Sequence, residues 1–272
     1  MWIKFFQNSQ AEIPPGLQNG EKRAIMGVRG KNDMKVTLCI PLYNEEAILA
    51  ETIDTVSAYM TAAFPDHFEV IFIDDGSTDN SKAILEERCS GPVRYLSYQP
   101  NRGKGCAVRQ GMLAGEGDYI IFTDCDLAYG LDVIPEMVAL FDEHPEYDAV
   151  VGSRVKHPEG YAGYSFPRKV VSKTYLSLLR FWGGLSLSDS QTGLKGFRRD
   201  VAKRIFALCE VDRFAFDYEA IKIGQKCGYR FGELPVKIVN HRPSTIRFFR
   251  DTRRMLRDVG RAKKRIKKLK ID

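Results

Sequence analysis

The alternation of short apolar runs with helical patterns is the feature that most constrains how this chain can fold. Four runs are rich in β-branched and aromatic residues, at positions 36–40, 68–73, 93–97 and 119–123. A stretch with apolar residues at helical spacing follows each of the first three, beginning near residue 44, including residues 83–85, and spanning residues 105–114. Such alternation predicts an α/β fold with a mostly parallel sheet and helices on both faces.

The alternation becomes less regular after the fourth run. Helical patterns are expected at 135–141 and 170–181, and further strands at 149–152, 195–197 and 236–239. Asn44 is expected to cap the first helix, because Glu45 and Glu46 would then lie in its first turn, where negative charge is favourable.

Positive charge is concentrated at the C-terminal end. The 272 residues carry a net charge of +6, but residues 247–272 hold twelve Lys or Arg and three Asp or Glu, which leaves −3 for the rest. Apolar residues recur there at helical spacing, at positions 248, 249, 255, 256 and 259. A basic amphipathic helix is typical of binding to an anionic membrane surface. The alternative is a solvated tail without a partner, whereas no aromatic-interleaved basic stripe favours nucleic acid.

Composition divides the chain into three parts. Residues 1–33 are expected to be a flexible leader, residues 34–246 the main domain, and residues 247–272 a basic amphipathic tail. No run of about 18 apolar residues predicts a membrane span, and the start of the chain does not resemble a secretory signal. The six scattered cysteines favour reduced thiols. We therefore expect a cytoplasmic protein that associates peripherally with a membrane.

Carboxylates follow two of the expected strands, where ligands bind in parallel sheets. Asp124 and Asp126 come directly after residues 119–123, and two such carboxylates can hold a divalent cation against diphosphate oxygens. The alternative is a solvated turn. Asp75 lies in the sequence DDGSTD after residue 73, and it could accept hydrogen bonds from a nucleobase or a ribose hydroxyl. A plain strand-to-helix connection is the alternative there.

A glycine-rich basic stretch opens the third helix. The sequence NRGKG at 101–105 places Lys104 and flexible backbone near a helix N-terminus, which is typical of a cradle for an anion. It matches no standard phosphate-binding loop, so an ordinary helix start remains the alternative.

Taken in order, these motifs resemble the signature of family 2 inverting glycosyltransferases with the GT-A fold. The resemblance covers residues 35 to 260, through IPLYNEE (40–46), DDGSTD (74–79), NRGKG (101–105), DCD (124–126), GSR (152–154), QTGLKGF (191–197) and FDYE (216–219). The last two blocks are most similar to the dolichyl- or polyprenyl-phosphate hexose transferases.

The resemblance implies a role for each matching residue. The nucleotide would be bound by Pro41, Tyr43, Glu45, Asp75, Lys104, Asp124 and Arg247, and Mg²⁺ or Mn²⁺ by Asp124 and Asp126. The acceptor phosphate would be bound by Arg154, Arg168 and Ser172, and catalysis would involve Gln191, Asp217 and Glu219. The chain departs from the pattern in three places. Ala128 replaces a metal-binding glutamine, and His241 replaces a loop arginine. The two acids that form a Glu-Asp pair in many relatives are separated here, as Asp217-Tyr218-Glu219.

The predicted function is therefore transfer of a hexose, with glucose from UDP-glucose as the favoured donor, onto a dolichyl or polyprenyl phosphate at the cytosolic face of a membrane. A phosphate acceptor is already anionic, so Arg154 and Arg168 would position it without a strong base. A soluble or polysaccharide hydroxyl acceptor would instead need Asp217 or Glu219 as base. A nucleotide-sugar-binding protein without turnover is the third hypothesis.

Overall fold

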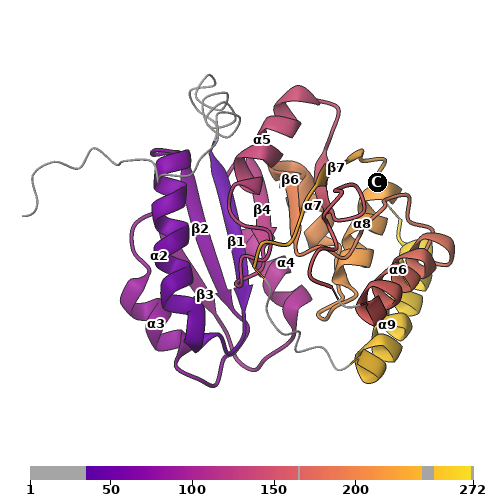
Figure 1. Ribbon diagram of the computed structural model, residues 1–272, viewed down its shortest axis with the longest axis horizontal. Helices are drawn as coiled ribbons and strands as arrows, with labels where there is room; N and C mark the ends of the chain where they lie inside the picture. Colours follow the sequence, from indigo (N-terminus) through magenta and orange to yellow (C-terminus); the bar gives the residue numbers. More distant parts are fainter. Residues whose placement is uncertain (1–34, 165, 241–247, 271–272) are drawn as a thin grey trace, which may run out of the picture.

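A seven-stranded sheet forms the centre of the molecule (Figure 1). The computed structural model describes residues 35–164, 166–240 and 248–270, apart from the side chains of residues 167, 168, 171 and 248–254. The strands are β1 (Val36–Leu42), β2 (Phe68–Asp74), β3 (Val93–Ser97), β4 (Tyr119–Thr123), β5 (Ala149–Ser153), β6 (Leu194–Arg198) and β7 (Phe231–Pro235). They lie in the order β3-β2-β1-β4-β6-β5-β7.

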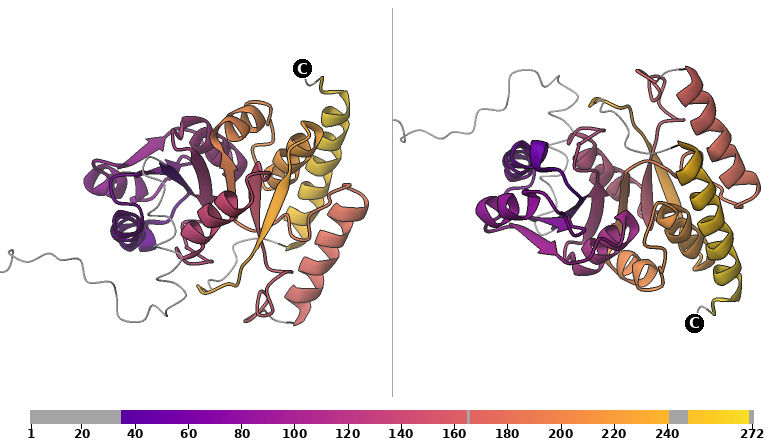
Figure 2. Two further views of the ribbon diagram at one scale, coloured as in Figure 1. Left: turned by 90° about the horizontal axis from the view of Figure 1, so that it is seen from above. Right: turned by 90° about the horizontal axis from the view of Figure 1, so that it is seen from below.

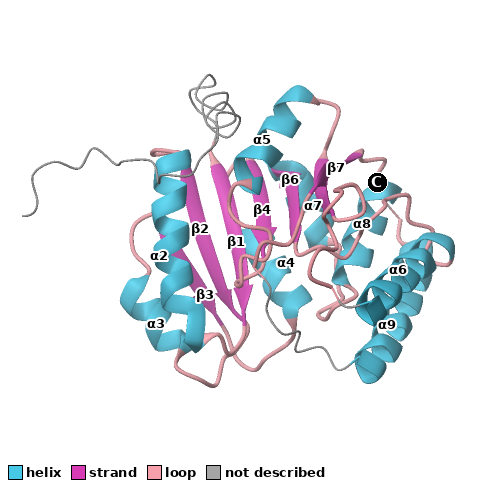
Figure 3. Cartoon of the chain, viewed as in Figure 1, coloured by secondary structure: helices cyan, strands magenta, loops and turns pink. Residues whose placement is uncertain are grey.

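Helices cover both faces of this sheet (Figures 2 and 3). They are α2 (Glu46–Ala63), α3 (Ser81–Arg88), α4 (Lys104–Ala114), α5 (Val133–Glu143), α6 (Phe166–Phe181), α7 (Arg199–Ala207), α8 (Phe216–Lys226) and α9 (Phe248–Lys268). Buried residues of α2, α3 and α5 form one hydrophobic core with the sheet. Those of α4, α7, α8 and α9 form a second core on the opposite face. The predicted α/β architecture with helices on both faces is therefore confirmed.

The sheet is mixed at one position. Strands β1, β2, β3 and β4 pair in parallel, as do β5 and β7, but β6 runs antiparallel to both of its neighbours. The residues just before β6 therefore lie at the same edge as the carboxyl ends of the other strands. This reversal brings the sequence QTG at 191–193 to the edge where the acidic motifs lie.

The strand expected at 236–239 is wrong, because the strand β7 ends at Pro235. The N–H of Val236 still donates to the carbonyl of Ser153 (3.1 Å), and the N–H of Val239 donates to that of Ala128 (2.8 Å). The chain thus leaves the sheet to cover the turn that follows Asp124 and Asp126.

Asn44 does not cap the first helix as expected. The residue before α2 is Glu45, and no side-chain cap is formed. Asn44 instead adopts a left-handed conformation (φ 55°), and its side-chain oxygen accepts the N–H of Thr78 (2.8 Å). Its own N–H donates to the Ser77 hydroxyl (2.9 Å). Asn44 therefore joins the loops that follow β1 and β2.

The C-terminal half of α9 packs on the folded domain, whereas the sequence predicts residues 247–272 as a separate tail. Val259, Ala262 and Ile266 are buried in the core that also holds α8. The described residues of α9 that are exposed are all basic: Arg257, Arg261, Lys263, Lys264, Lys267 and Lys268. Of the apolar positions predicted for this helix, Val259 is therefore covered by protein, and the exposed residues in the described part of α9 form a basic face.

Two further sequence expectations can be compared with the structure. In the ranges that the structure describes, we find no helix with the length and apolar character needed to cross a membrane. All six cysteines are free thiols.

We predict that Ile266→Ala lowers the free energy of unfolding by about 2–5 kcal/mol, because it removes apolar volume between α9 and α8. The exposed Lys264→Ala on the same helix should change it by less than about 0.5 kcal/mol. Chemical denaturation of both variants measures the difference. Equal stability of the two variants would contradict the packing of α9.

Candidate active site

The acidic and basic motifs predicted from the sequence converge at one edge of the sheet. The parallel register pairs Leu42 with Asp74 at the ends of β1 and β2 and Cys39 with Phe122 of β4, so these strands end toward the same edge. Gly193 reaches this edge from the start of the antiparallel β6. Ligands of open α/β sheets bind at such carboxyl edges.

Asp124 and Asp126 lie on a tight turn after β4. Leu127 has a left-handed backbone (φ 48°), and the carboxylate of Asp126 accepts the N–H of Ala128 (3.1 Å). The Lys104 ammonium donates to the Asp124 carboxylate. Both of these side chains are about 30% exposed, so the pair is accessible to a ligand.

Lys104 stays positively charged in this surrounding. Burial alone would lower the pKa of its ammonium, but the carboxylates of Asp124, Asp217 and Asp126 outweigh burial and raise that pKa above its ordinary value. A fixed cation beside two carboxylates can bind the oxygens of a diphosphate while the carboxylates hold a metal ion.

Gly193 lies directly against Asp124. A Cβ atom built on Gly193 would lie 2.0 Å from Oδ2 of Asp124, so no larger residue fits without moving that carboxylate. The glycine of the QTG sequence therefore lets the loop before β6 close over the acidic turn.

The acidic turn fits a divalent cation only in part. Within the described ranges, no group of three or more His, Cys, Asp or Glu side chains is arranged to hold a metal ion. Asp124 and Asp126 provide two carboxylates, and Ala128 has no side-chain ligand to add. Mg²⁺ is commonly held by one or two carboxylates together with substrate phosphates and water. The donor set therefore fits a cation that binds together with a diphosphate.

Asp75 occupies the cradle that the sequence predicted for a phosphate. One carboxylate oxygen accepts the Tyr98 hydroxyl (2.7 Å) and the N–H of Arg102 (3.0 Å). The other accepts the Asn101 side-chain amide (2.8 Å) and the N–H of Gly103 (2.7 Å). The two loop amides thus bind Asp75, a carboxylate of the protein itself. A nucleobase would have to displace or share one of these four donors.

The other nucleotide residues predicted from the first motif line the end of β1. Pro41 is buried within the strand, Tyr43 is exposed just after it, and Glu45 is partly exposed before α2. Arg247 and His241 lie outside the described residues.

Asp217 reaches the site through a buried ion pair. The Lys195 ammonium donates to Oδ1 of Asp217 (2.6 Å) and to the carbonyl of Thr192 (2.6 Å), and it lies 5.3 Å from the centre of the Phe122 ring. Burial raises the pKa of Asp217 above its ordinary value, against the opposing charge of Lys195. Sequence analysis missed Lys195, although it lies within the QTGLKGF block.

Glu219 lies on the other side of α8 and does not join Asp217. Its carboxylate is fully buried and accepts the backbone N–H groups of Glu210 (2.9 Å) and Val211 (2.7 Å) and the Arg265 guanidinium (2.6 Å). These contacts hold Glu219 between α8, α9 and the residues before α8, and its expected role as a base stays a prediction.

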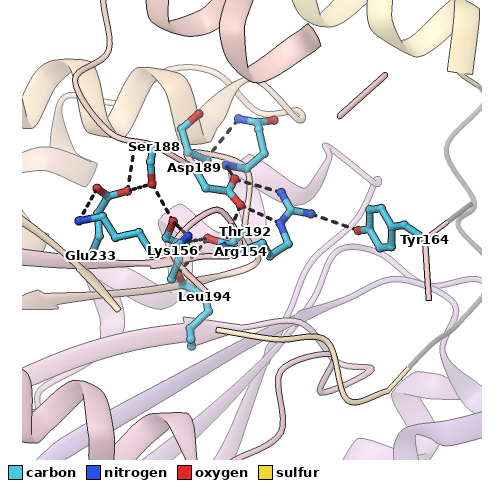
Figure 4. A network of polar contacts seen from close by, with 12 residues as sticks. Arg154, Lys156, Tyr164, Ser188, Asp189, Thr192, Leu194 and Glu233 are labelled. Carbon is cyan, nitrogen blue, oxygen red and sulfur yellow. Dashed lines mark hydrogen bonds and ion pairs between the residues drawn. The ribbon is translucent and has the colours of Figure 1, made fainter. Parts of the chain in front are cut away.

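Arg154 is the centre of a second polar network (Figure 4). Its guanidinium forms two hydrogen bonds with the buried Asp189, from Nε (2.7 Å) and Nη2 (3.0 Å), and Nη1 donates to the Tyr164 hydroxyl (3.1 Å). Asp189 also accepts the N–H of Gln191 (3.1 Å). The pair fixes the loop that ends in Gly193, and sequence analysis did not single out Asp189.

A neighbouring set of contacts fixes the start of the same loop. Ser188 donates from its N–H to the Glu233 carboxylate (2.8 Å), which also pairs with Lys156 (3.3 Å), and the Thr192 hydroxyl donates to the carbonyl of Gly152 (2.7 Å). Residues of β5 and β7 therefore hold the loop of residues 188–193 in place.

The remaining acceptor residues lie on α6. Ser172 is partly exposed and lies close to Tyr161. The centre of the Tyr161 ring lies 5.6 Å from Cζ of Arg154. Arg168 belongs to the same helix, but its side chain is outside the described part of the chain. Arg154 and Ser172 are thus brought into one region.

Comparison with known proteins gives matches in sequence and in structure. The model of the family described as Glycosyl transferase family 2 matches residues 37–206. A dolichyl-phosphate beta-glucosyltransferase of Homo sapiens is 30% identical over 240 residues, which cover 82% of this chain and 70% of that protein. One from Dictyostelium discoideum is 25% identical over 96% of this chain and 83% of that protein.

The fold is similar to that of solved glycosyltransferases. Glucosyl-3-phosphoglycerate synthase from Mycobacterium tuberculosis, in complex with Mn²⁺, UDP-glucose and phosphoglyceric acid, superposes with a TM-score of 0.64 at 19% identity. The match covers 96% of this chain and 88% of that chain. The expected GT-A fold is confirmed by this likeness.

We predict that Gly193→Ala weakens binding of Mn²⁺ together with UDP by about tenfold or more, because its Cβ would displace the Asp124 carboxylate. Gly260→Ala on α9 is the matched control, since its Cβ would meet Trp182 at an ordinary 3.4 Å. Isothermal titration calorimetry measures both. Unchanged binding in Gly193→Ala would contradict the close approach.

Proposed function

Because the chain belongs to glycosyl transferase family 2, we propose that its acidic edge binds UDP-glucose and transfers the glucose to a dolichyl or polyprenyl phosphate at the cytosolic face of a membrane. The observation that carries the proposal is the meeting of Lys104, Asp124 and Gly193 at the carboxyl edge of the sheet. The relatives named dolichyl-phosphate beta-glucosyltransferase support the choice of donor sugar and acceptor.

The donor end of the site is formed by one cation and two carboxylates. Asp124 and Asp126 would hold Mg²⁺ or Mn²⁺, which when bound would stabilise negative charge on the diphosphate. Lys104 would move from Asp124 to the diphosphate oxygens, because both partners are anionic and the ligand brings more charge. Pro41, Tyr43, Glu45 and Asp75 lie at the ends of β1 and β2, where the uridine would bind.

The acceptor would supply its own nucleophile. An oxygen of the lipid phosphate attacks C1 of the glucose from the face opposite the diphosphate, the C1–oxygen bond to UDP breaks, and its electron pair leaves with UDP. This displacement inverts the configuration at C1 and moves no proton from the acceptor. The acidic side chains at the site are therefore not required as a base.

The acceptor phosphate would bind beside Arg154. The guanidinium would keep its pair with Asp189, while Nη1 donates to the Tyr164 hydroxyl and Cζ lies 5.6 Å from the centre of the Tyr161 ring. Arg168 on the same helix would add a second cation. Gln191, which Asp189 holds through its N–H, would lie near the transferred sugar.

A hydroxyl acceptor is the alternative within the same family. It would need a base, and Asp217 is the acid at the site whose pKa is raised in the direction that suits one. A protein that binds a nucleotide sugar without turnover would keep the donor contacts and lack transfer.

We predict that the protein with UDP-glucose, Mn²⁺ and a polyprenyl phosphate forms a β-linked lipid-phosphoglucose. Lys104→Met should lower kcat/KM by about 10²–10³-fold, the cost of losing a charge that stabilises the leaving group. Lys82→Met, which removes an exposed lysine of α3, is the matched control. Product by thin-layer chromatography and NMR checks the reaction. No transfer from any nucleotide sugar would contradict it.

The identity of the acceptor is tested by Asp217→Asn. If the acceptor is a phosphate, the transfer rate of this variant should stay within about tenfold of the wild-type rate. If the acceptor is a hydroxyl, the variant lacks the base and the transfer rate should fall by about 10²–10⁴-fold. Circular dichroism controls for folding, because the substitution leaves Lys195 without its carboxylate. A loss of the larger size, with the fold intact, would favour the hydroxyl acceptor.

We also propose that α6, beside α9, meets the membrane. Phe166 is 79% exposed and Phe181 is 89% exposed, and Val170 and Leu178 are exposed between them. At 100° per residue these four lie within an arc of about 120°. The Lys263 ammonium of α9 donates to the carbonyl of Trp182, directly after α6, so the two helices lie side by side (Figures 1 and 2).

Apolar and basic groups would act together at this surface. Exposed aromatic residues insert into the headgroup region, while lysines and arginines of α9 contribute about 1 kcal/mol each near an anionic leaflet. The acceptor region around Arg154 and Ser172 lies at the start of the same helix, so a lipid phosphate could enter from the surface.

We predict that Phe181→Ser lowers binding to phosphatidylserine-containing liposomes by about tenfold, because an apolar side chain no longer inserts. Phe214→Ser removes an exposed aromatic residue from the segment before α8, outside α6, and should leave binding unchanged. Liposome sedimentation measures both. Equal loss in the two variants would contradict the role of α6.

A further inference from the structure

The residues between α7 and α8 connect the C-terminal helix with the donor side of the site. We call residues 208–213 the bridge segment. On one side its backbone contacts Glu219 of α8 and Arg265 of α9. On the other side it packs against residues 101–105, the loop that presents Lys104 to Asp124.

The α9 side of the bridge segment is held by charge. The buried Glu219 carboxylate accepts the N–H groups of Glu210 and Val211 on one oxygen and Arg265 on the other. Arg265 also donates to the carbonyl of Leu208 (2.7 Å) and pairs with the Glu210 carboxylate (3.1 Å). One guanidinium therefore holds the bridge segment both directly and through Glu219.

The donor side of the bridge segment is held by Asp212. Its carboxylate accepts Nη2 of Arg102 (3.1 Å) and Nη2 of Arg109 (2.5 Å), and its carbonyl accepts the N–H of Cys106 (3.1 Å). Arg102 comes two residues before Lys104, and Cys106 comes two residues after it. Asp212 thus fixes the chain on both sides of the lysine.

Two glycines make this contact close. A Cβ on Gly103 would lie 2.6 Å from the carbonyl oxygen of Asp212, and one on Gly105 would lie 2.4 Å from that of Val211. Backbone therefore meets backbone on either side of Lys104. A displacement of the bridge segment toward the loop has no side chain to absorb it, so the loop must move with it.

We propose that Arg265 is a positioning residue for nucleotide binding: through Glu219 it fixes the bridge segment, and the bridge segment fixes the loop that carries Lys104. The inference rests on the proposed donor site. It assigns to α9 a part in that site through the contacts of Arg265 with Glu219 and with the bridge segment.

Loss of the arginine leaves a charge that the fold must accommodate. Without Arg265, the Glu219 carboxylate remains fully buried with two backbone donors. A buried charge with unfilled acceptor positions is costly, and water or a shifted backbone must supply the missing partner. Either response changes the position of residues 210–211. A cavity of ≈ 510 Å³ bordered by Arg265 and Glu219 gives water access to this point.

The chain offers a matched control at the other end of the same helix pair. Lys226 of α8 donates to the carbonyls of Ile266 (2.6 Å) and Lys267 (3.2 Å) of α9. This contact also joins α8 to α9 through a single cation, but it touches no residue of the bridge segment. A purely structural role for Arg265 would make the two variants equivalent.

Calorimetric titration of UDP in the presence of Mn²⁺ tests the inference on the full chain. Arg265→Met should weaken UDP binding by about 2- to 30-fold, the range found for couplings that act without ligand contact. Lys226→Met should leave UDP affinity unchanged, although it also removes a cation that joins α8 to α9. Arg265→Lys retains one charged donor to Glu219 and should recover part of the affinity. Equal UDP affinity in Arg265→Met and wild type would overturn the proposal.

Hydrogen exchange on the wild-type protein gives a second test that does not depend on a variant folding. Coupling is reciprocal, so UDP should slow amide exchange in residues 208–213 and in the last turns of α9. Unchanged exchange there, in protein that binds UDP, would overturn the inference alone. A wild-type protein that binds neither UDP nor UDP-glucose would instead overturn the proposed function, and this inference with it.

Discussion

Contact among Asp124, Lys104 and Gly193 is the constraint on which the site depends. The three residues come from the end of β4, the start of α4 and the loop before β6. The Asp124 carboxylate contacts both of the others: it accepts the Lys104 ammonium and lies against Gly193. The carboxylate needs the lysine because it lies at the end of a buried strand, and it needs the glycine because any Cβ would overlap it. The antiparallel direction of β6 makes the meeting possible, since a parallel strand would begin at the opposite edge of the sheet.

Buried acids elsewhere in the molecule hold loops in place. Asp75 fixes residues 101–103, Asp189 fixes the loop before Gly193 through Arg154, and Glu219 fixes the bridge segment. A buried ion pair contributes little net stability because desolvation offsets its Coulomb attraction, but removing one partner is costly. These buried contacts therefore restrict each loop to one position. A site that binds a diphosphate between three loops gains from this restriction, because less order must be imposed when the ligand binds.

The sequence predicted the frame of the fold well and the use of individual acids poorly. Strands at 93–97 and 119–123 were predicted at their observed bounds. The second is an apolar run closed by the acidic residues 124 and 126, which leaves little choice for its end. Asp217 and Glu219 appeared as two candidates for one role. Residues two positions apart in a helix point to opposite faces, so one reaches the active site and the other reaches α9. Lys195 and Asp189 were missed because a buried charge is visible only once its partner from another segment is known.

Amphipathic patterns show the same limit on a larger scale. The sequence marks α9 as amphipathic and basic, but a helical pattern does not say whether protein or lipid covers its apolar face. In the structure Val259, Ala262 and Ile266 of α9 are buried in one core with α8, whereas Phe166 and Phe181 of α6 are exposed. Under the proposed membrane contact, the two properties expected of one helix are divided between two: α6 offers apolar side chains and α9 offers charge. Because α9 also holds the bridge segment, the helix that would bind an anionic surface is the same one that supports residues 101–105, the loop that carries Lys104.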